Sequence, residues 1–384
     1  MTTAQPLPVV SLQAPKDVSI AEIEAELDRI WQSYGSGESG TLATRASTFT
    51  LVICDAVDAS PNQPGKVADA IAAAYPCRIV TLIPTSGSDE GLSAQVSAYC
   101  PMEKRQASSL ICCESIALQG APDAFERNAA MVEGLMLNDL PSFVWWKASP
   151  DFDSGLFRHL AQNSSAPIVD SSAFDAPEGV LRRVTELVGQ GIPVADLNWR
   201  RLAAWQELTA EAFDPPERRA AIAEIDRVTI DYERGNQTQA LMYLGWLAGR
   251  LQWRPESYSH EGGDYDLRHV TFVAPDQRVV TAELAGIPVA DPGEVVGDLI
   301  GLRLASTNLN ADCCTVLCSE STGCMRMEAG GGAQSCRVQQ VTPLFDQRTE
   351  MLLAQQLRRW GRDQLFEESM VVTHEILNLA AQQG

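Results

Sequence analysis

The sequence FTLVIC at residues 49–54, followed after a helical stretch by RIVTLI at residues 78–83, decides the fold class of this chain. Each run is short, rich in β-branched residues and bounded by turn residues, which predicts a strand. The stretch between them, residues 64–75, has the composition of a helix. A strand, a helix and a second strand in this order are typical of an α/β sheet.

The same alternation extends on both sides of this segment. Upstream, apolar residues recur every three or four positions from Ile20 to Tyr34, which predicts a helix packed on a core. Downstream we predict strands at 94–99, 110–118, 143–146 and 168–170, and helices at 122–136, 154–163 and 177–188. Residues 94–99 alternate apolar and polar, as in a half-exposed strand, so we predict a mixed-sheet α/β domain over residues 1–190.

A second domain is predicted over residues 191–384, because glycines and Pro193 interrupt the helical periodicity near residue 190. Helices are expected near residues 198 and 236, and at 344–360 and 364–379. Between them, residues 268–341 show only strand signals. The predicted architecture is an α+β domain with an antiparallel sheet backed by helices, containing a cysteine-rich hairpin region at 313–336.

Composition restricts the possible partners. The chain has 384 residues, 45% of them apolar, which suits about two globular domains. A net charge of −21 makes nucleic acids and anionic membranes poor candidate partners. The first residues lack the features of a signal peptide, and we therefore expect a cytoplasmic protein whose cysteines are thiols by default. A disulfide in that compartment is more often redox-sensing than structural.

Enzyme signatures are weak. Gly35-Ser-Gly37-Glu-Ser-Gly40 matches a dinucleotide-binding pattern, but it follows a predicted helix instead of a strand and carries Glu38 where a phosphate would approach. We interpret it as a linker. The sequence shows neither a phosphate-binding P-loop nor zinc-spaced histidines nor a nucleophile elbow, so we assign no catalytic residue, metal or cofactor. The alternative is an oxidoreductase subunit with a nucleotide site around residues 35–60.

The clustered thiols are the sharpest feature. Five of the ten cysteines lie close together, at Cys313, Cys314, Cys318, Cys324 and Cys336. Three interpretations stay open. They could bind zinc in a scaffold, although no C-x-x-C knuckle is present. They could be small buried side chains, an interpretation that suits Cys54, Cys77, Cys112 and Cys113 equally well. Or Cys318 could pair with Cys324 across a turn, where closing so short a loop stabilises by only roughly 2 kcal/mol, which suits a reversible switch.

Two further groups are candidate partner-binding residues. Trp145-Trp146-Lys147 places two aromatic rings on opposite faces of a strand, so that one ring would be exposed beside a lysine. A sheet covered by helices on both faces is the alternative. Arg200 and Arg201 stand out on an acidic chain, although ion pairs on a helix surface explain them as well.

Long strings of this sequence resemble the OpcA family, the glucose-6-phosphate dehydrogenase assembly proteins of cyanobacteria. They run nearly from end to end: VSLQAPKD (10–17), LPSFVWWK (140–147), DLNWRRLAAWQELTAEAFDPPER (196–218), GGDYD (262–266), ADCC (311–314) through MRMEAGGGAQSC (325–336), and WGRD (360–363). The resemblance implies a non-catalytic partner that binds glucose-6-phosphate dehydrogenase, promotes its active oligomer and raises its activity. It also implies control by thioredoxin. We expect no cofactor.

Overall fold

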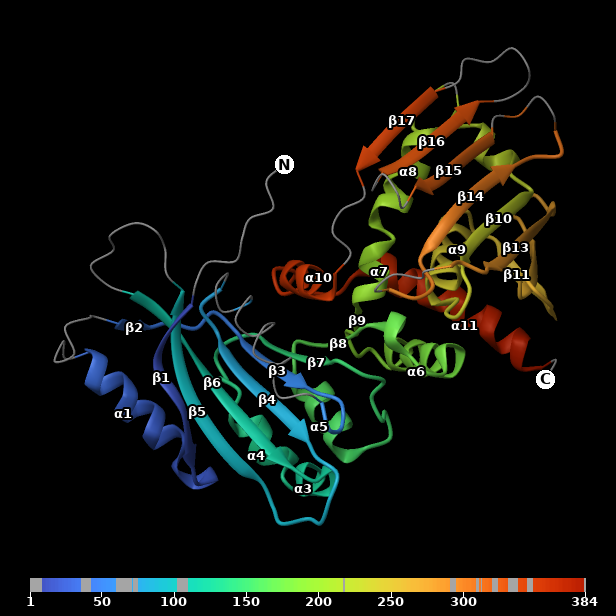
Figure 1. Cartoon of the computed structure of the whole chain (residues 1–384). Coiled ribbons are helices and arrows are strands. Elements are labelled where there is room, and N and C mark those ends of the chain that lie inside the picture. Colours follow the sequence, from blue (N-terminus) through green and yellow to red (C-terminus); the bar gives the residue numbers. More distant parts are fainter. Residues whose placement is uncertain are drawn as a thin grey trace. The chain divides into compact units, whose positions relative to one another are not determined.

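The computed structural model describes residues 9–35, 43–59, 71, 75–101, 110–216, 218–290, 295–308, 311, 313–319, 324–330, 338–343 and 348–382. They form two compact units, coloured along the sequence in Figure 1. The first unit comprises residues 1–169, 192–195 and 353–361, and the second comprises 170–191, 196–352 and 362–384. The predicted domain division after residue 190 stays a prediction.

The first unit is built on a mixed sheet, as the alternation predicted. Its strands are β1 (Val9–Val18), β2 (Ala43–Arg45), β3 (Thr50–Cys54), β4 (Arg78–Pro84), β5 (Ser93–Pro101), β6 (Leu110–Gly120), β7 (Ser142–Trp146), β8 (Ala166–Val169) and β9 (Ala195–Asp196). They lie in the order β1-β5-β6-β4-β3-β7-β8-β9, with β2 beside β6. Strand β5 is antiparallel to both of its neighbours, whereas β6, β4, β3, β7 and β8 run parallel.

Burial explains why these strands lie at the centre. All five residues of β3 are buried, as expected for a parallel strand covered on both faces. The helices are α1 (Ile23–Gly35), preceded by a 3-10 turn η1 (Ile20–Glu22), then α3 (Pro122–Arg127), α4 (Ala129–Gly134) and α5 (Gly155–Asn163). The apolar stripe of α1 is buried, with Leu27 0% exposed. The helix predicted at 64–75 lies mostly outside the described residues.

The second unit contains an eight-stranded sheet. Its strands are β10 (Arg227–Glu233), β11 (Arg254–Gly262), β12 (Leu267–Val273), β13 (Val279–Ile287), β14 (Leu299–Ala305), β15 (Cys313–Ser319), β16 (Cys324–Gly330) and β17 (Val338–Pro343). The order is β11-β12-β13-β10-β14-β15-β16-β17. The predicted antiparallel sheet is confirmed for all but one of its strand pairs, since β10 and β13 pair in parallel. The reason is that α9 and the β11–β12 hairpin intervene between them, so the chain returns beside β10 in the same direction.

Among the described residues, six helices follow β8 along the chain. They are α6 (Pro177–Gly189), α7 (Leu197–Arg201), α8 (Ala203–Phe213), α9 (Thr238–Arg250), α10 (Thr349–Gln356) and α11 (Gln364–Ala381), with 3-10 turns η2 (Ser171–Ala173) and η3 (Ala221–Glu224). Three of them, α8, α9 and α11, contact this sheet. Helix α8 contacts β15 and β16, and α9 contacts β10. Helix α11 packs on α9 at Gly245, where a Cβ atom would lie 2.7 Å from the Ser369 carbonyl oxygen.

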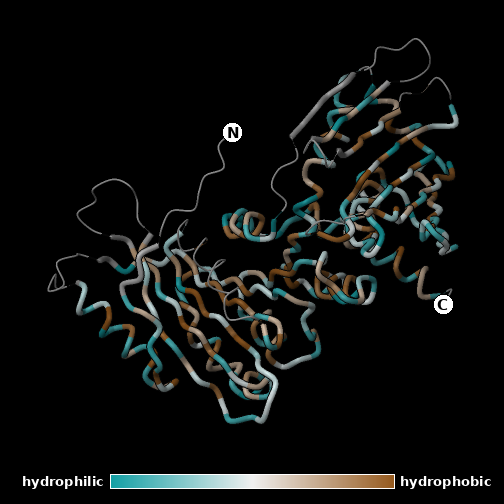
Figure 2. Tube along the Cα trace, viewed as in Figure 1, coloured by the Kyte–Doolittle hydropathy of each residue, from teal (hydrophilic) through white to brown (hydrophobic). Residues whose placement is uncertain are grey.

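Hydrophobic residues, brown in Figure 2, follow the strands and the inner helix faces of each unit. This distribution matches the buried core, which includes Val52 and Val80 in the first unit and Leu244 and Phe272 in the second. Within the part of the chain that the structure describes, no helix is both long and apolar enough to cross a membrane.

Candidate functional site

The strand order of the first sheet reverses between β3 and β7. From β3 the chain builds β4 and then β6 on one side, and later returns to build β7 and β8 on the other. In open parallel sheets, ligands bind outside the carboxyl ends of the strands at such a reversal. The residues that directly follow β3 and β7 are therefore the first candidates for a site in this unit.

An ion pair occupies this position. Asp55 follows β3, Lys147 follows β7, and their side chains are in contact, with the Asp55 carboxylate 1% exposed and the Lys147 side chain 17% exposed. The Lys147 amide donates to the Cys54 carbonyl at 3.1 Å, and Lys147 Nζ lies 5.9 Å from the centre of the Trp145 ring. Because the two charges satisfy each other, the carboxyl edge presents a net-neutral group here.

The tryptophans of the predicted partner-binding group are both buried. Trp145 is 3% exposed and Trp146 is 7% exposed. The Trp146 ring packs on Phe157 of α5, with the ring centres 4.7 Å apart. This corrects the expectation that one ring is exposed, and the reason is that the sheet is covered on both faces at β7. Partner binding at Trp145, Trp146 and Lys147 stays a prediction.

The described loop after β3 does not resemble a nucleotide site. Residues 55–59 read DAVDA and contain no glycine, whereas a pyrophosphate site here needs glycines that let backbone amides approach. The glycine motif at 35–40 lies between α1 and β2 instead, and residues 36–42 are outside the described residues. These facts give no support to the nucleotide-binding alternative.

A polar cavity of about 340 Å³ lies at the opposite, amino end of β7. Its lining includes Glu133, Asn138, Ser142 and Ser165. The Glu133 carboxylate is bonded to the His159 ring at 2.5 Å. Ligands of open parallel sheets bind at the carboxyl ends of the strands, so the position of this cavity does not favour a catalytic site.

The arginines of the second predicted group take part in ion pairs inside the second unit. The Arg201 side chain is 0% exposed and donates to both oxygens of Asp170, at 2.7 and 2.9 Å. Arg200 Nη2 lies 2.9 Å from Asp363, and its side chain is 12% exposed. Arg201 is buried because α7 turns this residue inward onto the carboxylate that follows β8, and partner binding by Arg201 stays a prediction. Partner binding by Arg200 stays a prediction.

A second buried carboxylate lies beside this ion pair. Asp196 Oδ1 accepts hydrogen bonds from the amides of Ser171, at 3.0 Å, and Asn198, at 2.9 Å, and so caps the start of α7. Burial and then the negative charge of Asp170 raise the pKa of Asp196 to about 6. Burial alone would raise the pKa of Asp170 too, but the hydrogen bonds and charge of Arg201 hold it below its ordinary value.

Strands β15 and β16 form the hairpin predicted for the thiol-rich region. Their register pairs Cys318 with Met325 and Ser319 with Cys324. The side chains of both cysteines lie outside the described residues, so their pairing stays a prediction. In the described part of β15, Cys313 is half-buried and Cys314 is buried, which raises the pKa of Cys314 to about 12. Cys336 is outside the described residues.

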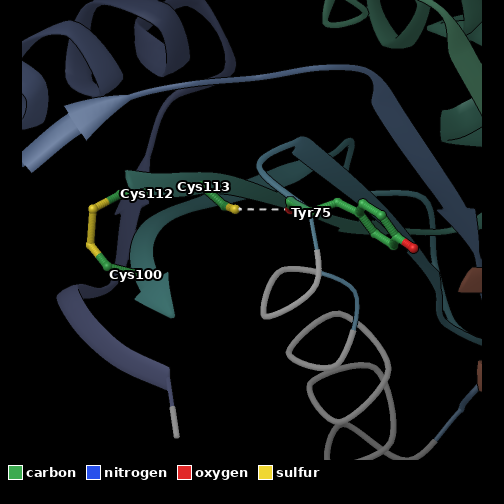
Figure 3. Close-up of a disulfide and its surroundings, with 4 residues drawn as sticks. All are labelled: Tyr75, Cys100, Cys112 and Cys113. Carbon is green, nitrogen blue, oxygen red and sulfur yellow. Dashed lines mark hydrogen bonds between the residues drawn. A yellow bond between two sulfur atoms is a disulfide. The ribbon is translucent and has the colours of Figure 1, made fainter. Parts of the chain in front are cut away.

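The described residues contain a disulfide in a different place. Cys100 of β5 and Cys112 of β6 are bonded, with their Cα atoms 4.2 Å apart (Figure 3). We grouped Cys112 with the buried thiols, and the bond corrects that interpretation. The sequence predicts no role for Cys100. The register of β5 and β6 explains the bond. Tyr99 lies opposite Cys113, and one position further along each strand Cys100 lies opposite Cys112.

The described residue ranges contain no candidate metal site. No group of three or more His, Cys, Asp or Glu side chains among those residues could hold a metal ion. Most thiol side chains of the 313–336 region fall outside those ranges, so the zinc alternative rests on the sequence alone.

Solved structures resemble the chain only distantly. The 3-ketoreductase KijD10 from Actinomadura kijaniata has a TM-score of 0.47 and 10% identity, over 87% of this chain and 96% of that chain. A levoglucosan dehydrogenase has a TM-score of 0.47 and 8% identity, over 87% of this chain and 98% of that chain. Likeness at this level carries no argument about activity.

Sequence comparisons are far more specific. A family model described as glucose-6-phosphate dehydrogenase subunit N-terminal domain matches residues 68–186, and one described as the C-terminal domain of that subunit matches residues 192–370. The chain is 50% identical to the OxPP cycle protein OpcA of Nostoc punctiforme, over 97% of this chain and 96% of that protein. It is 48% identical to the protein of the same name from Synechocystis, over 99% of this chain and 96% of that protein. This chain therefore belongs to the OpcA family of glucose-6-phosphate dehydrogenase subunits.

Proposed function

We propose that this chain is a non-catalytic partner of glucose-6-phosphate dehydrogenase that promotes its active oligomer and raises its activity, and so controls the oxidative pentose phosphate pathway. It acts in the cytoplasm, and thioredoxin adjusts it through Cys318 and Cys324. The observation that carries the proposal is the match of both domains, nearly from end to end, to a family described as subunits of that dehydrogenase.

The described site residues agree with a binding role. The ion pair of Asp55 and Lys147 lies at the carboxyl ends of β3 and β7, where a sheet of this kind would hold a small molecule. An activator acts by binding the active form of its partner more tightly than the inactive form, and a tenfold preference corresponds to about 1.4 kcal/mol. Such a preference needs only a modest change in a contact surface.

The thiol-rich hairpin is the proposed source of that change. Cys324 is the first residue of β16 and lies opposite Ser319, the last residue of β15, while Cys318 is the residue before Ser319. A disulfide between them would fix the turn, and its reduction would release it. Surface residues on these strands, including Leu317, which is 51% exposed, would move with it.

The first experiment is a titration of this chain into the glucose-6-phosphate dehydrogenase of its own organism. Oxidised and reduced samples are compared at fixed substrate, and NADPH formation is followed. We expect a saturable rise in rate whose midpoint depends on the redox state. A flat titration in both states would refute the proposed function.

We expect Cys324→Ser to abolish the redox dependence while the chain still binds the dehydrogenase, because the remaining thiol has no partner across the turn. Oxidised and reduced variant should then give the same midpoint, against a difference of about tenfold for the wild type if 1.4 kcal/mol separates the two states. The matched control is Cys313→Ser, which removes a half-buried thiol from β15, the strand that pairs with β16. If Cys324→Ser responds to reductant as the wild type does, this pair is not the switch.

A further inference from the structure

The bond between Cys100 and Cys112 is not needed to hold its two strands together. Strands β5 and β6 also pair through backbone contacts at each position from Ser93 opposite Gln119 to Tyr99 opposite Cys113. The disulfide lies at one end of this ladder. The sheet therefore remains formed whether the two sulfur atoms are bonded or reduced.

Helix α1 covers the bond. Both cysteines are 0% exposed, and the partly buried rings of Trp31 and Tyr34 pack on them. Residue Glu114 lies two positions after Cys112 on β6, so it faces the same side of the sheet. Its carboxylate accepts a hydrogen bond from the Trp31 indole at 2.9 Å. The end of α1 therefore covers the disulfide.

Other contacts of α1 hold its first half. Glu24 pairs with Arg78 at 2.6 Å, and Glu26 pairs with Lys16 at 2.5 Å. These ion pairs lie one to two turns before Trp31, so the end of α1 from Trp31 to Gly35 can lift while the helix stays attached at its beginning. Terminal turns of helices open with smaller free energies than the core does.

We propose that Cys100–Cys112 is a reversible thiol–disulfide exchange site, reached by a dithiol reductant when the end of α1 from Trp31 to Gly35 lifts. A thiolate of the reductant attacks one sulfur, forms a mixed disulfide and releases the other cysteine as a thiolate. The second thiol of the reductant then displaces the first cysteine. Two electrons and two protons pass to this chain, which gains two thiols, and the reductant leaves as a disulfide.

A second pair of cysteines, Cys113 of β6 and Cys77, serves as an internal reference for the reduction experiment. Cys113 follows Cys112, so its side chain points to the opposite face, where it donates to the Tyr75 carbonyl at 3.4 Å (Figure 3). Its sulfur accepts a hydrogen bond from Cys77, which raises the pKa of Cys77 and lowers that of Cys113. Neither Cys77 nor Cys113 takes part in a disulfide. A reductant that acts at Cys100–Cys112 leaves this pair unchanged.

The test measures reduction one cysteine at a time. The full chain is incubated with dithiothreitol under native conditions, quenched in acid and alkylated, and the peptides containing Cys100 and Cys112 are quantified by mass spectrometry. We expect Trp31→Ala to be reduced at least tenfold faster than the wild type, because the ring that covers the sulfur atoms is gone. Trp31→Phe, which keeps a ring but cannot bond Glu114, should show a smaller increase. The matched control is Trp360→Ala, which removes a ring that is 66% exposed and should not change the rate.

Hydrogen exchange gives the second measurement. The two bonded cysteines are 12 residues apart in the sequence. Reduction of the bond should therefore speed amide exchange at the Cys100 and Cys112 ends of β5 and β6 and in the last turn of α1 by up to about 100-fold. Amide exchange in β4 should stay unchanged. Equal reduction rates for the wild type and both Trp31 variants, with reduction only during global unfolding, would make the bond a permanent cross-link and overturn the proposal. So would alkylation of both cysteines in native protein prepared without reductant. Neither measurement involves the dehydrogenase, so this inference and the proposed function fail separately.

Discussion

Arg201→Ala should lower the free energy of unfolding of the second unit by about 3–5 kcal/mol, the cost of removing one partner from a buried ion pair. The Arg201 side chain is 0% exposed and bonds both oxygens of Asp170. Its Nη2 atom also donates to Thr349 Oγ1 at 3.3 Å. Without the guanidinium, Asp170 stays buried, charged and without its main partner. Urea denaturation, with hydrogen exchange followed on peptides from α7 and α9, measures the loss.

Two further variants make this expectation specific. Asp170→Asn in the Arg201→Ala background should recover part of the loss, because it removes the unpaired buried charge. Arg200→Ala should cost less, about 1–2 kcal/mol, since the ion pair of Arg200 with Asp363 is partly exposed. A loss below 1 kcal/mol for Arg201→Ala would contradict the described burial. Unchanged stability together with weaker binding of the dehydrogenase would identify Arg201 as a contact residue.

The same arginine shows where sequence reasoning stops. Adjacent arginines on an acidic chain indicate either a binding surface or ion pairs, and only the position of the partner decides between them. Asp170 is 31 residues away from Arg201, on the other side of α6. No local periodicity relates two such positions. The strands and helices themselves were predictable, because their apolar periodicities are local and strong.

Strand pairing sets a second limit. The sequence places strands at 94–99 and 110–118, but only their register puts Cys100 opposite Cys112. Similarly, β10 and β13 are parallel because an intervening helix and hairpin bring the chain back in the same direction. Trp145 and Trp146 are both buried because elements from elsewhere in the chain cover each face of β7. Each of these outcomes depends on contacts between segments far apart in sequence.

Asp196→Asn should stabilise the second unit by an amount that grows with pH. The pKa of Asp196 is raised to about 6 by burial and by Asp170. Below its ordinary value of 3.8 the carboxyl is protonated in both the folded and the unfolded chain, and it costs nothing. As pH rises from 3.8 to 6, the unfolded chain ionises first and stability is lost, reaching about 3 kcal/mol above pH 6. Asparagine does not ionise and avoids this loss.

Asparagine can also keep the structural role of this residue. Its side-chain oxygen can accept from the Ser171 and Asn198 amides as Asp196 Oδ1 does, while its NH₂ group replaces Oδ2, which has no hydrogen-bond partner among the described residues. Urea denaturation should show the variant more stable than wild type by about 1.5 kcal/mol at pH 5 and about 3 kcal/mol at pH 8. Glu368→Gln, in an exposed pair with Arg250, is the control and should cost less than about 1 kcal/mol. A difference that does not change between pH 5 and pH 8 would show that Asp196 ionises equally easily in the folded and unfolded chain, and that its burial beside Asp170 carries no electrostatic cost.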